Sequence, residues 1–286
     1  MKKRKIISCI LLCALVLSAC SSKKEEVQED SKKDEIRVVE QVPSFEEEES
    51  ASEETDEGDE ALVGEEEQTD MEPVKKNILI AIDPGHQAWS VDMSAQEPNA
   101  PGSGVMKAKA STGTSGRYSG IPEYQLNLDI SLMLRDELEK AGYDVIMTRE
   151  NNETAISNSE RAMLANNAGA DISIRIHANG SEDSSVNGAL ALITSPNNPY
   201  TGHLYNDSYR LAEQVLDSYC QFTGFANRGI QQNDTMTGIN WSEIPVMILE
   251  MGFMTNENDD MKMADGEFRK QMVAGIVDGI EKYYGE

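Results

Sequence analysis

The sequence predicts a single α/β domain over residues 75–286, with a mostly parallel, twisted sheet and helices on both faces. Short apolar runs bounded by Gly and Pro are typical of buried strands. Stretches with apolar residues at helical spacing lie between these runs. Because strand and helix patterns alternate along the chain, the layered α/β arrangement is favoured over separate helical and sheet domains.

The predicted strands begin with Ile78 to Ile82, which stops at a Pro-Gly turn followed by His86. The run 171–179 is also apolar and carries His177 close to its end, and the run 246–251 carries Glu250. Two further strands are predicted over residues 143–148 and 188–194.

The first predicted helix covers residues 122–140 and ends before Gly142. Proline at a first helical position and glycine after the last are common helix boundaries. Further helices are predicted from a capping box at Ser157 and Glu160 to about residue 168, and over residues 203–222 and 268–284.

The N-terminus has the pattern of a secretory signal peptide over residues 1–19. Four basic residues precede an apolar run, Ile6 to Leu17, that is short for a membrane span. The run ends in Leu-Ser-Ala-Cys, which resembles the bacterial lipoprotein signal and implies cleavage before Cys20 and lipidation of that residue. The alternatives are an ordinary signal cut after Ala19 and an uncleaved anchor.

Residues 20–74 are predicted to be a lipid-anchored, acidic, disordered linker. Residues 21–72 hold 22 acidic and 5 basic side chains with few apolar groups, so they cannot bury enough surface to offset their ordering entropy. A solvated spacer is favoured over an acidic docking site. Much of the net charge of −26 lies here, and an acidic chain is a poor binder of nucleic acid. Cleavage would leave Cys20 and Cys220, so no disulfide framework is predicted.

Polar side chains stand at the ends of predicted strands, where ligands bind in α/β sheets. His86, His177 and Glu250 follow or end such strands, and Glu123 begins the first helix. Two histidines and one glutamate with an open fourth position form a catalytic zinc set, and the remaining carboxylate is then free for proton transfer. A structural histidine, or a Glu123 that only complements a helix dipole, is the competing interpretation.

Three further residues are candidates for supporting roles. Asp83 lies close to His86 and could orient a ligand ring or cap the turn, with neither favoured. Arg175 could pair with a nearby acid, and Asn179 could bind substrate or hold its loop. Residues 87–121, rich in Gly, Ser, Ala and Pro, are expected to form a long loop that rims the crevice.

Four blocks occur in one order: IDPGH, PEYQLNL, RIHANG and VMILEMGFMTN. Together they resemble the zinc-dependent N-acetylmuramoyl-L-alanine amidases of bacterial cell-wall turnover, over roughly residues 78–285. The resemblance implies that His86, Glu123 and His177 bind one Zn²⁺ and that Glu250 is the catalytic glutamate. It also implies hydrolysis of the amide between N-acetylmuramic acid and L-alanine in peptidoglycan.

With the lipoprotein signal, the implied location is extracytoplasmic, anchored to the cell membrane and facing the wall. The alternatives are a non-catalytic peptidoglycan-binding or regulatory lipoprotein with an amidase-like fold, and another zinc-dependent amide hydrolase such as a peptidase. The long loop departs from the commonest family pattern, and the sequence leaves the need for a protein activator open.

Overall fold

A computed structural model of the chain describes residues 74–285. The predicted signal peptide, Cys20 and nearly all of the predicted linker lie outside the described residues. Among the described helices, none combines the length and the apolar character needed to cross a membrane.

The fold is built on a six-stranded sheet with the order β4-β1-β5-β8-β6-β7. The strands are β1 (Leu79–Pro84), β4 (Asp144–Met147), β5 (Ile172–Asn179), β6 (Ala189–Ile193), β7 (Asn227–Gln232) and β8 (Val246–Phe253). β4, β1, β5 and β8 run parallel, β6 is antiparallel to β8, and β7 is parallel to β6. The prediction of a mostly parallel sheet is therefore confirmed.

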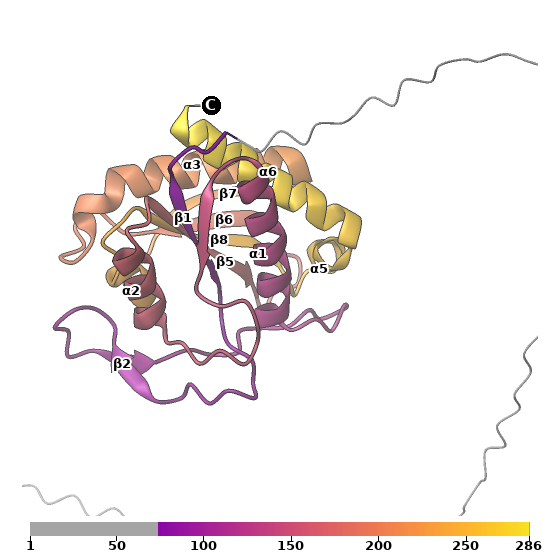
Figure 1. Cartoon of the computed structure of the whole chain (residues 1–286). Helices are drawn as coiled ribbons and strands as arrows, with labels where there is room; N and C mark the ends of the chain where they lie inside the picture. Colours follow the sequence, from indigo (N-terminus) through magenta and orange to yellow (C-terminus); the bar gives the residue numbers. More distant parts are fainter. Residues whose placement is uncertain (1–73, 286) are drawn as a thin grey trace, which may run out of the picture. The chain divides into compact units, whose positions relative to one another are not determined.

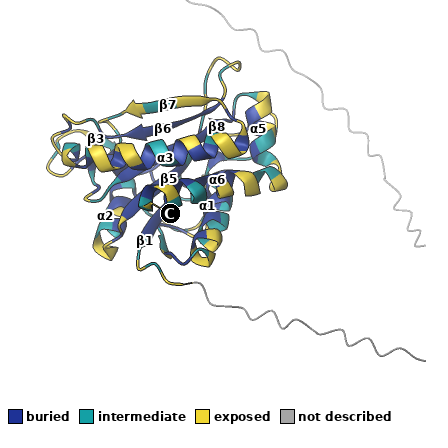
Figure 2. Cartoon of the chain, turned by 90° about the horizontal axis from the view of Figure 1, so that it is seen from above, coloured by how far each residue is buried: buried dark blue, intermediate teal, exposed yellow. Residues whose placement is uncertain are grey.

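Three long helices cover one face of the sheet. They are α1 (Glu123–Lys140), α3 (Tyr205–Thr223) and α6 (Gly266–Tyr284). Their apolar sides form the main core with the strands, and the helix surfaces that face away from it are exposed in Figure 2. α6 and α3 approach closely because Gly279 faces the backbone of Val215, where a Cβ atom would have no room.

The opposite face carries α2 (Asn158–Ala168) and the short α4 (Thr237–Asn240). Figure 1 shows α2 across β1 from α1. The buried apolar cluster beneath α2 is small: it consists of Ala81, Ala165 and Ala170, with Leu79, Ile146 and Ile244 partly buried against it. Helices therefore lie on both faces, as the sequence predicts, although the apolar core is larger on the α1 side.

The long segment between His86 and α1 contains two short antiparallel strands, β2 (Gln96–Pro98) and β3 (Met106–Ala108). The buried carboxylate of Glu97 accepts hydrogen bonds from the backbone N–H and hydroxyl of Ser159, at the start of α2. The indole of Trp241 donates to the Pro98 carbonyl at 2.9 Å. This part of the segment is thus docked on the α2 side of the sheet, and only its later residues border the site described below.

β2, β3 and α4 were not predicted from the sequence, and neither were two further elements, β7 and α5. β7 is a mostly exposed edge strand, so its polar sequence has no apolar alternation. α5 (Glu257–Ala264) follows β8 after a short turn and begins at Asn256, whose side chain accepts a hydrogen bond from the Asp259 N–H. The remaining helical segment is a 3₁₀ turn over Gly202–Leu204.

Candidate metal and catalytic site

The ends of the central parallel strands bring the candidate residues to one edge of the sheet. In the register of β5 with β8, His177 lies opposite Glu250. β1 pairs with β5 up to Pro84 and Ile176, so the turn after β1 carries His86 to the same edge. Parallel neighbours end together, which is why residues far apart in sequence meet here.

The turn that carries His86 is held by buried arginines. Arg149 donates to the carbonyls of Pro84 and Gly85, at 3.0 Å each. Arg161 donates to the carbonyls of Pro84 at 2.6 Å and His86 at 2.8 Å. His86 itself has φ of 65°, an uncommon left-handed conformation for a residue other than glycine. The arginines donate to three successive carbonyls and so stabilise this turn.

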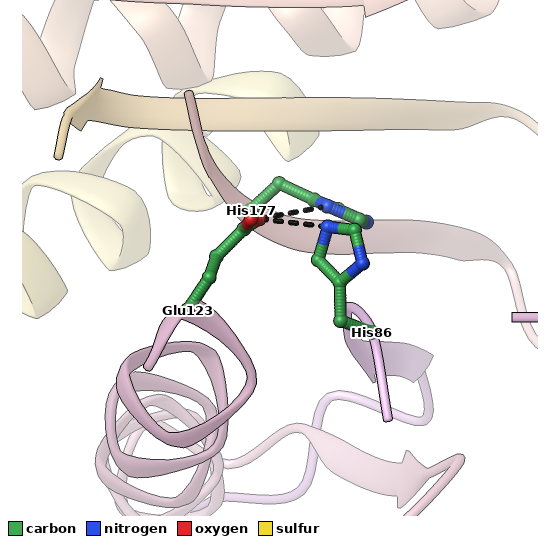
Figure 3. Close-up of side chains that lie close together, drawn as sticks. All are labelled: His86, Glu123 and His177. Carbon is green, nitrogen blue, oxygen red and sulfur yellow. Dashed lines mark ion pairs between the residues drawn. The ribbon is translucent and has the colours of Figure 1, made fainter. Parts of the chain in front are cut away.

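His86, Glu123 and His177 converge on one point (Figure 3). Glu123 Oε1 lies 2.9 Å from His86 Nε2 and 3.3 Å from His177 Nδ1. The candidate ligand atoms of the three residues lie within 4.8 Å of one another. Gly85 and Gly113 make this approach feasible, because a Cβ atom on Gly85 would overlap the His177 ring and one on Gly113 would overlap Glu123 Oε2.

This geometry fits a tetrahedral zinc ion. Zinc binds nitrogen and oxygen ligands at about 2.0–2.1 Å, so two of them lie roughly 3.3 Å apart. Burial lowers the pKa of His177 to about 4, so its imidazole is neutral near pH 7, as a metal ligand must be. His86 Nδ1 lies 3.2 Å from the Ser111 carbonyl. With a metal on Nε2, donation from Nδ1 to this carbonyl would hold the matching tautomer.

Glu123 has the environment of a permanently ionised ligand. Burial disfavours its charged form, but hydrogen bonds with the His177 and His86 rings outweigh burial and hold the pKa of Glu123 below its ordinary value. The backbone N–H groups of Thr114 and Ala178 also donate to its two oxygens, at 2.9 and 3.1 Å. These contacts fix the carboxylate from both sides.

Glu250 lines the same pocket of about 520 Å³ as the His–Glu–His group. Burial, with a smaller contribution from the negative charge of Glu123, raises the pKa of Glu250 to about 8. A carboxylate with a raised pKa binds a proton more readily than an ordinary glutamate, so it is suited to take and return a proton. The structure thus brings together all four residues that the sequence singled out.

The three supporting candidates have different positions. Asp83 is buried, pairs with Arg161 at 2.7 Å and with Arg175 at 2.9 Å, and so acts on the backbone of the turn through Arg161 rather than on a ligand ring. Its pKa is held below the ordinary value: burial opposes ionisation, but the two guanidinium groups outweigh it. Arg175 therefore has the acidic partner that its position suggested.

Asn179 lines the pocket, and its side-chain oxygen accepts a hydrogen bond from the Gly180 N–H at 2.8 Å. Its backbone carbonyl accepts from Met254 at 2.8 Å. These contacts are those of a loop-fixing residue, while its place on the pocket wall leaves contact with substrate open.

Sequence reasoning missed several residues that shape the site. Arg149 and Arg161 hold the turn, Ser111 contacts a ligand ring, and Arg117 borders the pocket. The local pattern around Arg149 gives no sign of its burial. Arg161 directly follows the predicted capping box, so its position at the first turn of a helix was readable, but its partners were not.

Comparison with known proteins identifies the class to which this fold and site belong. The sequence model of the N-acetylmuramoyl-L-alanine amidase family matches residues 80–282. The chain belongs to this family.

Individual relatives agree with this assignment. The chain is 30% identical over 166 residues to the N-acetylmuramoyl-L-alanine amidase LytC of Bacillus subtilis, a match to 58% of this chain but only 32% of LytC. The amidase Ami1 of Mycobacterium smegmatis has a similar structure, with a TM-score of 0.67 and 25% identity over 74% of this chain and 99% of Ami1. An amidase from Clostridium difficile 630 has a TM-score of 0.59 and 26% identity, covering 72% of this chain and 96% of that amidase.

Proposed function

We propose that the protein is a zinc-dependent N-acetylmuramoyl-L-alanine amidase that cleaves the amide between N-acetylmuramic acid and L-alanine in peptidoglycan. The observation that carries the proposal is the convergence of two imidazoles and a carboxylate, with a second carboxylate of raised pKa on the wall of the same pocket. Membership of the amidase family supports the choice of amide substrate.

In this proposal His86, Glu123 and His177 hold the metal. A zinc ion bound there supplies Lewis acidity toward the scissile carbonyl and the attacking water. Thr114 and Ala178 keep Glu123 in place, and Ser111 keeps His86 in place, through the hydrogen bonds described above. His177 lies on a strand of the sheet, and the turn with His86 and the helix with Glu123 are both held against that sheet. Little reorganisation is therefore needed when the metal binds.

Glu250 is the acid–base residue in this proposal. Its carboxylate accepts the proton that the attacking water loses as it adds to the carbonyl carbon. It then returns that proton to the alanine nitrogen as the carbon–nitrogen bond breaks. The products are a free N-terminal alanine on the stem peptide and a free carboxylate on the lactyl group.

The test is a comparison of the wild-type protein with Glu250→Gln. We expect the variant to keep one equivalent of zinc and to lose turnover by about 10²–10⁴-fold, because glutamine cannot accept the proton. The measurements are metal content and release of N-terminal alanine from peptidoglycan. A wild-type protein without stoichiometric zinc, or a variant with unchanged turnover, would contradict the proposal. Unchanged biological function of a variant that has lost turnover would favour the non-catalytic binding role.

We further propose that Cys20 is lipidated and that residues 20–74 tether the domain to the outer surface of the cell membrane. Support comes from the Leu-Ser-Ala-Cys sequence and from the acidic, apolar-poor segment that follows it. Replacing Cys20 with Ser should move the protein from the membrane fraction to the soluble extracytoplasmic fraction. Equal membrane association of both forms would refute the anchor.

A further inference from the structure

The pocket is lined by one positively charged side chain, Arg117, that has no ion-pair partner among the described residues. Among the described residues that line the pocket, Arg117 is the single Lys or Arg, whereas Glu123, Glu182 and Glu250 are carboxylates. Arg117 is exposed, and its guanidinium makes no hydrogen bond or ion pair within residues 74–285. An anionic ligand approaching this pocket would therefore find one cationic partner.

The backbone at Arg117 is held firmly, although its side chain makes no polar contact in the described part of the chain. The Arg117 N–H donates to the Met254 carbonyl at 2.9 Å. The next two N–H groups, of Tyr118 and Ser119, donate to one oxygen of the buried Asp260 at 2.7 and 2.9 Å. The Ser119 hydroxyl donates to the other Asp260 oxygen at 2.6 Å.

Gly116 completes this anchored turn. A Cβ atom at Gly116 would overlap the Asp260 carboxylate, so the close approach requires glycine. Asp260 lies on α5, directly after β8 and its Glu250. The position of Arg117 is thus tied to the strand that carries the proposed acid–base residue, which distinguishes it from an ordinary solvated surface arginine.

We propose that Arg117 is a specificity-determining residue that binds a free carboxylate of the stem peptide close to the scissile amide, an inference that rests on the proposed function. A guanidinium offers a planar fork of N–H donors that matches a carboxylate. The second residue of the stem, a glutamate linked through its side chain, presents its α-carboxylate one residue beyond the scissile amide. Some walls carry an amide there, which would not form the ion pair.

The experiment compares two muropeptides that differ only in a carboxylate or an amide on the second stem residue. For the carboxylate substrate, Arg117→Gln should lower kcat/KM by roughly 10- to 100-fold, the scale of a hydrogen bond to a charged group. The loss should appear in KM with kcat nearly unchanged, because the carboxylate carries no change in charge during the reaction and the contact is equally strong in the ground and transition states. For the amide substrate the change should stay within about threefold, as for a neutral surface substitution.

Two variants serve as controls. Arg117→Lys keeps the charge without the fork and should restore part of the loss. Arg135→Gln removes the same chemical group from α1, about 18 Å along the helix from Glu123, and should leave both substrates unaffected. Arg135 pairs with Asp136 and Glu150 on the surface.

An equal loss on both muropeptides would overturn the inference and point instead to a role at the scissile group. Unchanged kinetics of Arg117→Gln on the carboxylate substrate would also overturn it. Calorimetric binding of both muropeptides to the zinc-loaded Glu250→Gln protein, with and without Arg117→Gln, is independent of turnover. If the wild-type protein releases no alanine from peptidoglycan, the proposed function fails. The inference about Arg117 is still supported if the carboxylate muropeptide binds more tightly than the amide muropeptide and Arg117→Gln abolishes this difference.

Discussion

The ionisation of Glu250 should make the stability of the metal-free protein depend on pH. Its pKa rises from 4.5 to about 8 on folding, chiefly through burial. The folded state therefore binds the Glu250 proton more tightly than the unfolded state does, so stability falls as the pH rises from the unfolded value toward the folded one. Replacing Glu250 with Gln removes this dependence and keeps the shape of the side chain.

The magnitude follows from the shift. At 1.36 kcal/mol per pKa unit, a change from 4.5 to about 8 corresponds to at most about 5 kcal/mol. The side chain borders the open pocket, and water there screens part of the effect, so we expect about 2–5 kcal/mol. Glu250→Gln should match the wild type near pH 4.5 and exceed its free energy of unfolding by this amount near pH 8.

The assay is urea denaturation of both proteins at a series of pH values in the presence of a chelator. All other titrating groups are shared, so the difference between the two curves isolates Glu250. Saturating zinc should shrink the difference, because a nearby cation stabilises the ionised carboxylate. Parallel stability curves for the two metal-free proteins would refute the assignment of a desolvated carboxyl group at this position.

Two other substitutions test how the site is held. Asp83→Asn should lower the free energy of unfolding by about 3–5 kcal/mol, measured with urea, because it leaves Arg161 and Arg175 buried without their anion. Folding lowers the pKa of Asp83, so its contribution to stability is present above the ordinary pKa of 3.8 and is lost as the pH falls below that value. If Asp83→Asn lowers the free energy of unfolding by less than about 1 kcal/mol at pH 7, the buried pairing is contradicted. Gly113→Ala should weaken zinc binding by about 10- to 100-fold in a competition titration, because φ is 75° and the new methyl group would displace Glu123. Gly104→Ala, in the same segment with open space around it, is the matched control, and equal zinc affinity in both variants would be the contrary result.

Much of the fold was readable from the chain itself. The apolar runs that end in His86, His177 and Glu250 correspond to β1, β5 and β8, and the spacing of four in Leu126, Ile130, Leu134 and Leu138 lies on the buried side of α1. These patterns are local, because one period of two or 3.6 residues decides which side chains face the core. The sequence also located the four polar residues at element ends, where parallel strands present their ligands.

Only the tertiary structure decided how these residues are held. The link between Asp83 and Arg161 spans 78 positions, and the one between Tyr118 and Asp260 spans 142. No periodicity reports such pairings, because they depend on which elements pack side by side. For the same reason the sequence did not indicate that the part of the 87–121 segment around β2 docks on the α2 side of the sheet. Nor did it indicate that Arg117 lines the pocket without a side-chain partner among residues 74–285. The residues available for the proposed chemistry were thus visible in the chain, while their distances, burial and pKa values arose from packing.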